Sequence, residues 1–300
     1  MLSVIICTYN RDKYIFNVLK SIADNDFPVE KYEIILINNN CTDNTEIEYH
    51  RFQTSFPNVN LKYFIEKKQG LSYARNLGIS EAKGEILIYV DDDATVNKVF
   101  LSSYASFFEH NKNAYAAGGP VFPIYETKKP AWISHFTKNL ITGYLYFGDK
   151  IIEFKNGKYP AGGNAAYRKE IFDNVGLYNV NLGRSGGNLL GGEEKDIFDK
   201  MKNCKLRFFY LPTPVLYHLI PETKLSKDYF YRLTYSIGKS ERRRTLDISE
   251  TKYVKRLFLE TIKWGATLIL FIYYTLSLSP QKGLKLIHFR WNVSKGLLGK

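Results

Sequence analysis

Cysteine is scarce in this chain of 300 residues, and the few cysteines form no pattern. Cys7, Cys41 and Cys204 are odd in number, and none belongs to a CxxC pair or to another spacing typical of a metal site. A disulfide-stabilised secreted domain normally needs an even and denser set. We therefore expect reduced thiols, buried or incidental, in a cytoplasmic protein.

A signal peptide and a long membrane-spanning run are also missing. The first seven residues have no basic leader and no small-residue cleavage site, so they predict a strand. The apolar run 264–278 has 15 residues, fewer than the roughly 20 that a spanning helix requires. This length favours a buried or interfacial helix. No internal repeat or low-complexity linker is present.

Acidic residues are fewer than basic ones, and the imbalance lies mostly in the tail. The formal net charge is +12, and residues 239–300 alone contain 13 Lys or Arg and 4 Asp or Glu. Basic residues flank the apolar run on both sides, which favours attachment of residues 250–300 to an anionic membrane surface. The alternative is a helix packed on its own domain with a solvated basic rim. The first interpretation predicts a protein at the inner face of the cell membrane.

What the chain does contain is an alternation of strand-like and helix-like segments. Apolar runs at 2–7, 32–37, 61–65 and 85–90 are separated by segments of helical period. In the first of these, Ile15, Val18, Leu19 and Ile22 share one face. The pattern predicts a mostly parallel sheet covered by helices on both faces, with right-handed crossovers.

Three adjacent acids, Asp91, Asp92 and Asp93, follow the apolar run 85–90. Ligands of open α/β sheets bind at the carboxyl ends of the strands, where these acids are expected to lie. Like charges side by side repel, and a divalent cation carrying a ligand's phosphates would let them coexist. The run therefore indicates a metal-bound nucleotide. The alternative is a solvated acidic turn in which an Asp caps the next helix.

Four local patterns occur in a fixed order: VIICTYNR at 4–11, INNNCTDNT at 37–45, QGLSYARNLGI at 69–79 and DDD at 91–93. Together they resemble glycosyltransferase family 2, the inverting nucleotide-sugar transferases of GT-A fold. The resemblance covers residues 3 to about 100 and continues less sharply to about 220. It implies an α/β fold, a single GT-A type Rossmann-like domain with a mostly parallel central sheet, followed by a C-terminal helical extension that is basic and partly apolar.

The resemblance also implies a division of the chain. Residues 1–235 would form the glycosyltransferase domain, with 1–100 as the nucleotide-sugar-binding half and 101–235 as the acceptor-side half. Residues 236–300 would form the extension.

For the donor site, the resemblance implies a metal ion and a set of contacts. Asp93 is the first expected ligand of Mn²⁺ or Mg²⁺, and His218 the second, although a lone histidine after a strand is more often structural. Asp91 would face the ribose or base. Asp92 would reach the metal through water or hold the turn. Arg75 can offer a planar fork to phosphate, or be merely solvated. The remaining expected donor contacts are Thr8, Tyr9, Asn10, Arg11, Asn39 and Asn76.

One departure from the family concerns the base. The family often has two acids where this chain has Asn38 and Asn39. An Asp at the second position accepts a hydrogen bond from uracil N3, whereas an Asn amide can accept or donate. A UDP-sugar remains the favoured donor, with a GDP-sugar possible.

Inverting transfer needs one carboxylate to remove the proton of the acceptor hydroxyl. Residues 191–196 (GGEEKD) resemble the family's Glu-Asp region, with Glu in place of Asp at the second position. The resemblance implies Glu194 as the base, on a helix predicted over about 193–203. Its neighbour Glu193 is the alternative base, because adjacent helical residues point about 100° apart and only one of them faces the acceptor well. Both could instead only complement the positive end of the helix dipole.

The resemblance, together with these residues, implies a glycosyltransferase that moves a sugar, with inversion, to a hydroxyl of a glycan or lipid-linked acceptor in bacterial-type cell-surface polysaccharide synthesis. A sugar nucleotidyltransferase is disfavoured because residues 8–13 contain no glycine. A basic nucleic-acid-binding protein is disfavoured because the basic groups gather beside the apolar tail. We therefore expect no nucleic-acid partner. A catalytically inactive membrane adaptor on the same fold is the remaining alternative.

Overall fold

The computed structural model describes all 300 residues and divides them into two compact units. The first contains residues 1–124, 144–181 and 193–219, and the second contains 125–143, 182–192 and 220–300. The boundary expected at 235/236 lies inside helix α8 (Lys227–Ile248). The second unit also takes two segments from the middle of the chain, which the sequence division did not separate.

An eight-stranded sheet forms the centre of the first unit, in the order β3-β2-β1-β4-β9-β6-β10-β8. The four strands predicted from the apolar runs are confirmed, and they pair in parallel. β9 runs antiparallel to both of its neighbours, and β8 runs antiparallel to β10. The strands are β1 (Leu2–Thr8), β2 (Tyr32–Asn38), β3 (Leu61–Ile65), β4 (Ile86–Val90), β6 (Ala114–Gly118), β8 (Ile152–Glu153), β9 (Asn164–Arg168) and β10 (Arg207–Tyr210).

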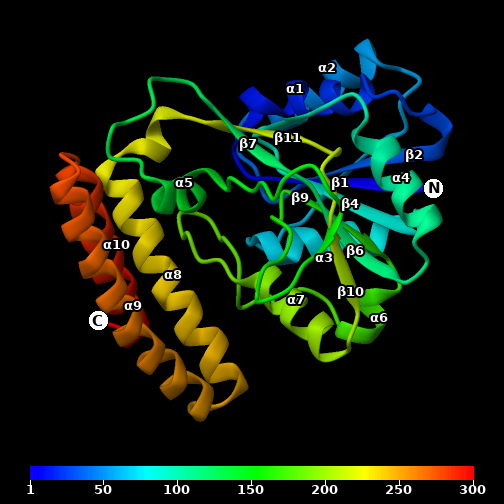
Figure 1. Cartoon of the computed structure of the whole chain (residues 1–300). Coiled ribbons are helices and arrows are strands. Elements are labelled where there is room, and N and C mark those ends of the chain that lie inside the picture. Colours follow the sequence, from blue (N-terminus) through cyan, green and yellow to red (C-terminus); the bar gives the residue numbers. More distant parts are fainter. The chain divides into compact units, whose positions relative to one another are not determined.

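Helices cover this sheet on both faces (Figure 1). Alternate residues of a strand point to opposite faces, so Val4 and Ile6 join one core and Ile5 the other. The first core includes α1 (Asp12–Ala23), α2 (Thr45–Ser55) and α4 (Phe100–His110). The second includes α3 (Leu71–Glu81), α6 (Ile171–Val175) and α7 (Glu193–Asn203). The short 3-10 helix η1 (Val29–Lys31) precedes β2.

A second sheet of three strands follows the acidic run directly. Its order is β5 (Ala94–Val96), β11 (Leu216–Ile220) and β7 (Val121–Tyr125). β11 pairs antiparallel with β5, and this register sets His218 opposite Ala94. The pairing brings residues from the end of the first unit beside the acids that follow β4.

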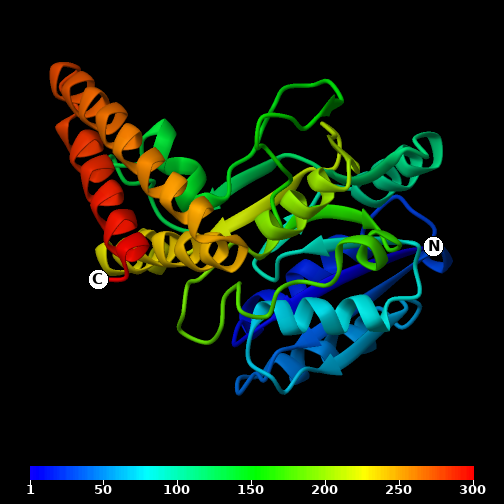
Figure 2. The same cartoon turned by 90° about the horizontal axis from the view of Figure 1, so that it is seen from below.

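The second unit is helical and contains α5 (His135–Thr142), η2 (Glu222–Leu225), α8, α9 (Glu250–Leu276) and α10 (Pro280–Leu298) (Figure 2). A Cβ atom at Gly238 of α8 would lie 2.0 Å from the carbonyl oxygen of Val293, so α8 and α10 approach backbone to backbone. α9 has 27 residues and is long and apolar enough to cross a membrane, and only 17% of its apolar window is buried. It is therefore longer than the 15-residue run suggested, and it is not a buried core helix.

Candidate active site

The acids after β4 are compensated by an arginine from the first loop. Asp92 and Asp93 are only 6% and 3% exposed. Arg11 Nη1 donates to Asp92 Oδ1 at 2.8 Å and to Asp93 Oδ2 at 2.5 Å. The chain continues into strand β5 and not into a helix. The alternative of a solvated acidic turn that caps a helix is therefore wrong.

Burial and charge act against each other in this cluster. Burial raises the pKa of Asp92, the positive charge of Arg11 lowers it, and the neighbouring Asp93 raises it again, with a net upward shift. The pKa of Arg11 is also raised, chiefly by the Asp92 carboxylate. The guanidinium of Arg11 is thus paired with the carboxylates of Asp92 and Asp93, which are almost completely buried.

His218 is the second group that the structure brings to Asp93. Its Nε2 lies 3.3 Å from Asp93 Oδ1, because β11 pairs with β5. No group of three or more His, Cys, Asp or Glu side chains is placed to hold a metal ion. One carboxylate and one imidazole still fit a divalent cation that takes its other ligands from phosphate oxygens and water, as Mg²⁺ commonly does in nucleotide sites.

Arg75 joins the two glutamates that begin α7. Its Nη1 lies 3.0 Å from Glu193 Oε1, and its Nη2 lies 2.9 Å from Glu194 Oε1. Burial alone would lower the pKa of Arg75, but the charges of Glu194 and Glu193 raise it well above its ordinary value. The guanidinium of Arg75 thus pairs with two carboxylates. From the sequence we expected a contact with phosphate or a solvated side chain, and not this pairing.

The two glutamates differ in their access to solvent. The Glu193 side chain is 4% exposed, whereas that of Glu194 is 28% exposed. The buried Glu193 pairs with the buried guanidinium, and Glu194 keeps part of its carboxylate open. The structure therefore makes Glu194 the more accessible of the two candidate bases.

Two glycines before β9 lie between the acidic run and the glutamates. A Cβ atom at Gly163 would lie 2.1 Å from Asp91 Oδ2, and one at Gly162 would lie 1.7 Å from Glu194 Oε1. β9 starts beside the end of β4, where Asn164 pairs with Val90. The carboxylates of Asp91 and Glu194 therefore lie against the backbone of consecutive glycines, which places the acidic run close to the candidate base.

Residues of the first loop lie at the same edge of the sheet. Thr8 is buried and Tyr9 is 38% exposed. Asn10 has a positive φ of 51°, and its side-chain oxygen accepts a hydrogen bond from the Thr42 amide at 2.8 Å. The loops after β1 and β2 are thus tied together at this edge, and the expected contacts of Thr8, Tyr9 and Asn10 with the donor stay predictions.

The side chains of Asn39 and Asn76 are engaged with the protein's own backbone. Asn39 Nδ2 donates to the carbonyls of Glu66 and Lys68 at 3.2 and 2.7 Å, and its Oδ1 accepts from the Gly70 amide at 2.8 Å. Asn76 exchanges two hydrogen bonds with the backbone of Tyr178, at 3.0 and 2.9 Å. Both amides shape the loops around the site, and their expected contacts with the donor stay predictions.

Asn164 is a structurally important residue that is not among the site residues expected from the sequence. Its Nδ2 donates to the carbonyls of Pro120 and Pro214 at 2.9 Å, and its Oδ1 accepts from the Tyr104 hydroxyl at 2.6 Å. The side chain is completely buried. One amide therefore fixes three segments around the start of β9. The only available signal was its position directly after two glycines.

The thiol of Cys7 is not a candidate nucleophile. All three cysteines are free, and burial raises the pKa of the Cys7 thiol to about 12. A thiol with so high a pKa remains protonated at neutral pH and is a poor nucleophile.

The sequence matches a family model described as Glycosyl transferase family 2 over residues 3–176. It is 27% identical over 189 residues to the glucosyl-dolichyl phosphate glucuronosyltransferase of Haloferax volcanii, a match that covers 61% of this chain and 58% of that protein. It is 31% identical over 109 residues to the poly(ribitol-phosphate) beta-N-acetylglucosaminyltransferase TarS of Staphylococcus aureus, covering 36% and 19%. The matches thus span less than two thirds of either relative.

Two solved structures share the fold. The mannosyltransferase PcManGT from Pyrobaculum calidifontis, in complex with GDP-Man and Mn²⁺, superposes with a TM-score of 0.65 at 17% identity, covering 100% of this chain and 87% of that one. S. aureus TarS 1–349 in complex with UDP-GlcNAc gives a TM-score of 0.53 at 17% identity, covering 100% and 92%. At this identity the likeness shows the fold, which agrees with the predicted α/β architecture.

Proposed function

Because the chain belongs to glycosyl transferase family 2, we propose that it transfers a sugar from a nucleoside diphosphate to a hydroxyl group of a glycan or lipid-linked acceptor, with inversion at the anomeric carbon. The observation that carries this proposal is the placement of Asp91 and Glu194 on consecutive glycines. One carboxylate belongs to the acidic run after β4, and the other is the accessible candidate base.

Asp93 and His218 are the residues that would hold Mn²⁺ or Mg²⁺, assisted by Asp92 directly or through water. When bound, such an ion neutralises the charge that develops on the diphosphate as the glycosidic bond breaks. Arg11, 2.5 Å from Asp93, adds a second positive charge at the same place. Charge stabilisation of this kind is strongest where water is excluded, as it is around these buried acids.

Glu194 would remove the proton from the acceptor hydroxyl. The Arg75 guanidinium holds one of its carboxylate oxygens, which fixes its direction and leaves the other oxygen for the hydroxyl. Glu193 would balance the charge of Arg75 from the buried side. Proton transfer by a placed side chain contributes about 10²- to 10⁴-fold to a reaction rate.

The nucleoside would lie against residues 8–11 and Asp91, at the edge where the loops after β1 and β2 meet. UDP is favoured and GDP is the alternative. The solved structures of the same fold include complexes with UDP-GlcNAc and with GDP-Man, which supports both.

A lipid-linked or polymeric acceptor is supported by the names of the relatives, which include a glucosyl-dolichyl phosphate and a poly(ribitol-phosphate) glycosyltransferase. We propose that this chain acts at the cytoplasmic face of the cell membrane, in the synthesis of a cell-surface polysaccharide.

Thermal unfolding with UDP, GDP, UDP-GlcNAc and GDP-Man, each with and without Mn²⁺ or Mg²⁺, tests the donor site. A ligand at 100 times its Kd stabilises the native state by about 2.7 kcal/mol. We expect a metal-dependent rise in Tm with one of the nucleotides, which Asp93→Ala and His218→Ala diminish. Tyr217→Phe, at the half-exposed neighbour of His218 on β11, is the control.

Glu194→Gln separates binding from chemistry. It should keep the metal-dependent rise in Tm and lower the rate of transfer by about 10²- to 10⁴-fold. Transfer near the wild-type rate would remove Glu194 from its role as base. If a sugar nucleotide raises Tm equally with and without metal, donor binding does not require the metal ion, and that part of the proposal is wrong.

A further inference from the structure

Helix α9 has its polarity reversed relative to a helix on the surface of a protein in water. Its exposed side is an apolar row with spacings of three, four or seven, which places the row on one face. The packed side instead carries buried polar groups, among them Arg256, Glu260 and Thr267. The apolar row is Val254, Phe258, Ile262, Ile269, Ile272 and Leu276, whose members are 56–79% exposed.

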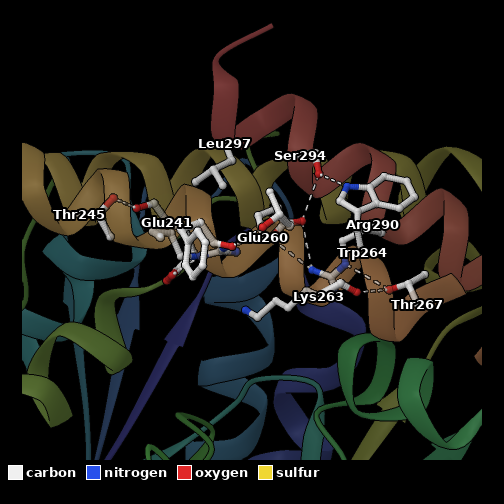
Figure 3. A network of polar contacts seen from close by, with 12 residues as sticks. Glu241, Thr245, Glu260, Lys263, Trp264, Thr267, Arg290, Ser294 and Leu297 are labelled. Carbon is white, nitrogen blue, oxygen red and sulfur yellow. Dashed lines mark hydrogen bonds and ion pairs between the residues drawn. The ribbon is translucent and has the colours of Figure 1, made fainter. Parts of the chain in front are cut away.

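The buried polar groups form a connected network between α8, α9 and α10 (Figure 3). Glu260 accepts from Arg256 at 2.8 Å and from Arg290 of α10 at 3.1 Å. Ser294 Oγ donates to Glu260 at 3.1 Å and accepts from Trp264 Nε1 at 3.0 Å. A buried charge that loses its partner is strongly destabilising, so this network fixes which side of α9 faces inward and which side stays exposed.

We propose that the apolar row of α9 docks on the surface of an anionic lipid bilayer, with the helix lying along that surface. Residues 250–300 contain nine Lys or Arg and two Asp or Glu, of which Arg256, Arg290 and Glu260 belong to the buried network. Seven Lys and one Glu remain outside it. Each basic residue near an anionic surface contributes about 1 kcal/mol of attraction. The apolar row supplies the insertion into the boundary between head groups and acyl chains. A row that runs from Val254 to Leu276 is also too extended for a small-molecule groove.

The packing of α10 argues against a helix that crosses the bilayer. α10 returns along α9, and a Cβ atom at its Gly283 would lie 2.9 Å from Phe271 Cδ2 of α9. Of the helices in the structure, only α9 is apolar and long enough to span. A spanning α9 would draw the Lys and Arg residues of α10 into hydrocarbon, at about 2.5–3.5 kcal/mol each at the centre. Lying flat, α9 buries its row and leaves these charges in the interface.

This docking surface refines the membrane attachment proposed above, and it does not depend on the transfer reaction. The two can therefore fail separately. Binding of the full chain to vesicles of phosphatidylcholine with 30% phosphatidylglycerol, and to vesicles of phosphatidylcholine alone, is measured by flotation. We expect binding to the anionic vesicles that weakens with salt.

The double variant Ile262→Asp/Ile269→Asp tests the row itself. Both side chains are exposed in the free protein, 56% and 69% respectively, so the fold should be retained, as checked by circular dichroism and Tm. We expect at least a tenfold loss of vesicle binding. Ile47→Asp is the matched control, because Ile47 is 63% exposed on α2 of the first unit, and it should bind as the wild type does.

Depth measurements distinguish lying from spanning. Phe258→Cys, Ile269→Cys and Leu276→Cys are each placed in a Cys204→Ser background, labelled with a fluorophore, and quenched by lipids brominated at different depths. Equal shallow depths support the proposal. A gradient through the bilayer centre overturns it, as does unchanged flotation of the double variant. Protection of these labels by a second copy of the chain in lipid-free solution, without vesicle binding, would also overturn it.

Discussion

The carboxylate of Glu194 lies directly against the backbone of Gly162. A Cβ atom at position 162 would be 1.7 Å from Glu194 Oε1 and 2.2 Å from its Cδ. No amino acid other than glycine therefore allows Glu194 to keep this position while it pairs with Arg75.

Gly162→Ala should displace Glu194 without touching the donor side. A misplacement of about 1 Å can lower a rate by about 10²-fold, so we expect that loss in kcat with a smaller change in the KM for the sugar nucleotide. Steady-state kinetics measure both. Gly187→Ala, at a position with no atom within 4 Å of the added Cβ, should change neither. Full activity of Gly162→Ala would show that Glu194 is not needed where the structure places it.

Arg11→Ala should uncover the acids that the guanidinium now covers. At an effective dielectric constant near 20, a unit charge 4 Å away contributes about 4 kcal/mol, so we expect Mn²⁺ alone to bind roughly tenfold tighter or more. Binding of UDP with Mn²⁺ should weaken, because a positive charge is lost from the diphosphate. Titration calorimetry measures both affinities. Arg51→Ala, an exposed arginine on α2, is the control, and equal Mn²⁺ affinity in wild type and Arg11→Ala would contradict the prediction.

Asn39→Asp restores the acid that related sequences often carry, and the structure predicts a cost. An aspartate cannot donate, so the hydrogen bonds to the carbonyls of Glu66 and Lys68 would be lost and replaced by repulsion. We expect the free energy of unfolding to fall by about 1–3 kcal/mol, measured by urea denaturation. Asn40→Asp, at an exposed neighbour, should have little effect. If Asn39→Asp were as stable as the wild type, the hydrogen bonds of Asn39 to the backbone would not be needed for stability, and its side chain could instead contact the base.

Glu33 should make stability depend on pH. Its carboxylate is fully buried and accepts from Ser3 Oγ and the Lys83 amide, both at 2.6 Å, and from Lys62. Burial alone would raise the pKa of Glu33, but these hydrogen bonds hold it below its ordinary value. The stability it provides is therefore present above the unfolded pKa, about 4.3, and is lost as pH falls through the lower folded pKa.

Glu33→Gln should lower the free energy of unfolding by about 1.5–3 kcal/mol at pH 7. The difference from the wild type should begin to shrink below the unfolded pKa of about 4.3. It should disappear as pH falls through the lower folded pKa, where the native carboxylate becomes protonated. Denaturant unfolding between pH 7 and pH 3 follows this difference. Glu30→Gln, an exposed acid three residues earlier, serves as the control. A difference that is constant over this range would contradict the assignment.

Local features of the chain could be predicted well from the sequence. The β-branched runs before Asp91 and after Tyr32 predict buried parallel strands, and the spacing of Ile15, Val18 and Leu19 predicts one buried helix face, because periodicity depends only on near neighbours. The helix at 193–203 was found for the same reason. Each of these agrees with the structure.

Contacts between distant segments could not be predicted in the same way. Arg75 meets Glu193 across 118 residues, and Asp93 meets His218 only because β11 runs antiparallel to β5. The exposed face of α9 could not be predicted either, because an apolar run in the sequence does not show which face of the helix packs against the protein. The buried side of α9 is held by Glu260 and its partners Arg290 and Ser294 on α10, which periodicity in one segment does not reveal.

β9 runs antiparallel to β4, so β9 begins at the edge of the sheet where β4 ends. This pairing limits which insertions and deletions the protein can accept during evolution. Gly163 and Asp91 are neighbours across one strand spacing of about 4.8 Å, so inserting or deleting a residue in either strand would slide one half of the site past the other. Segments outside the strands, such as the exposed residues 126–129, can change length without that penalty. Descendants that adopt new acceptors should therefore differ in those segments while the two glycines stay.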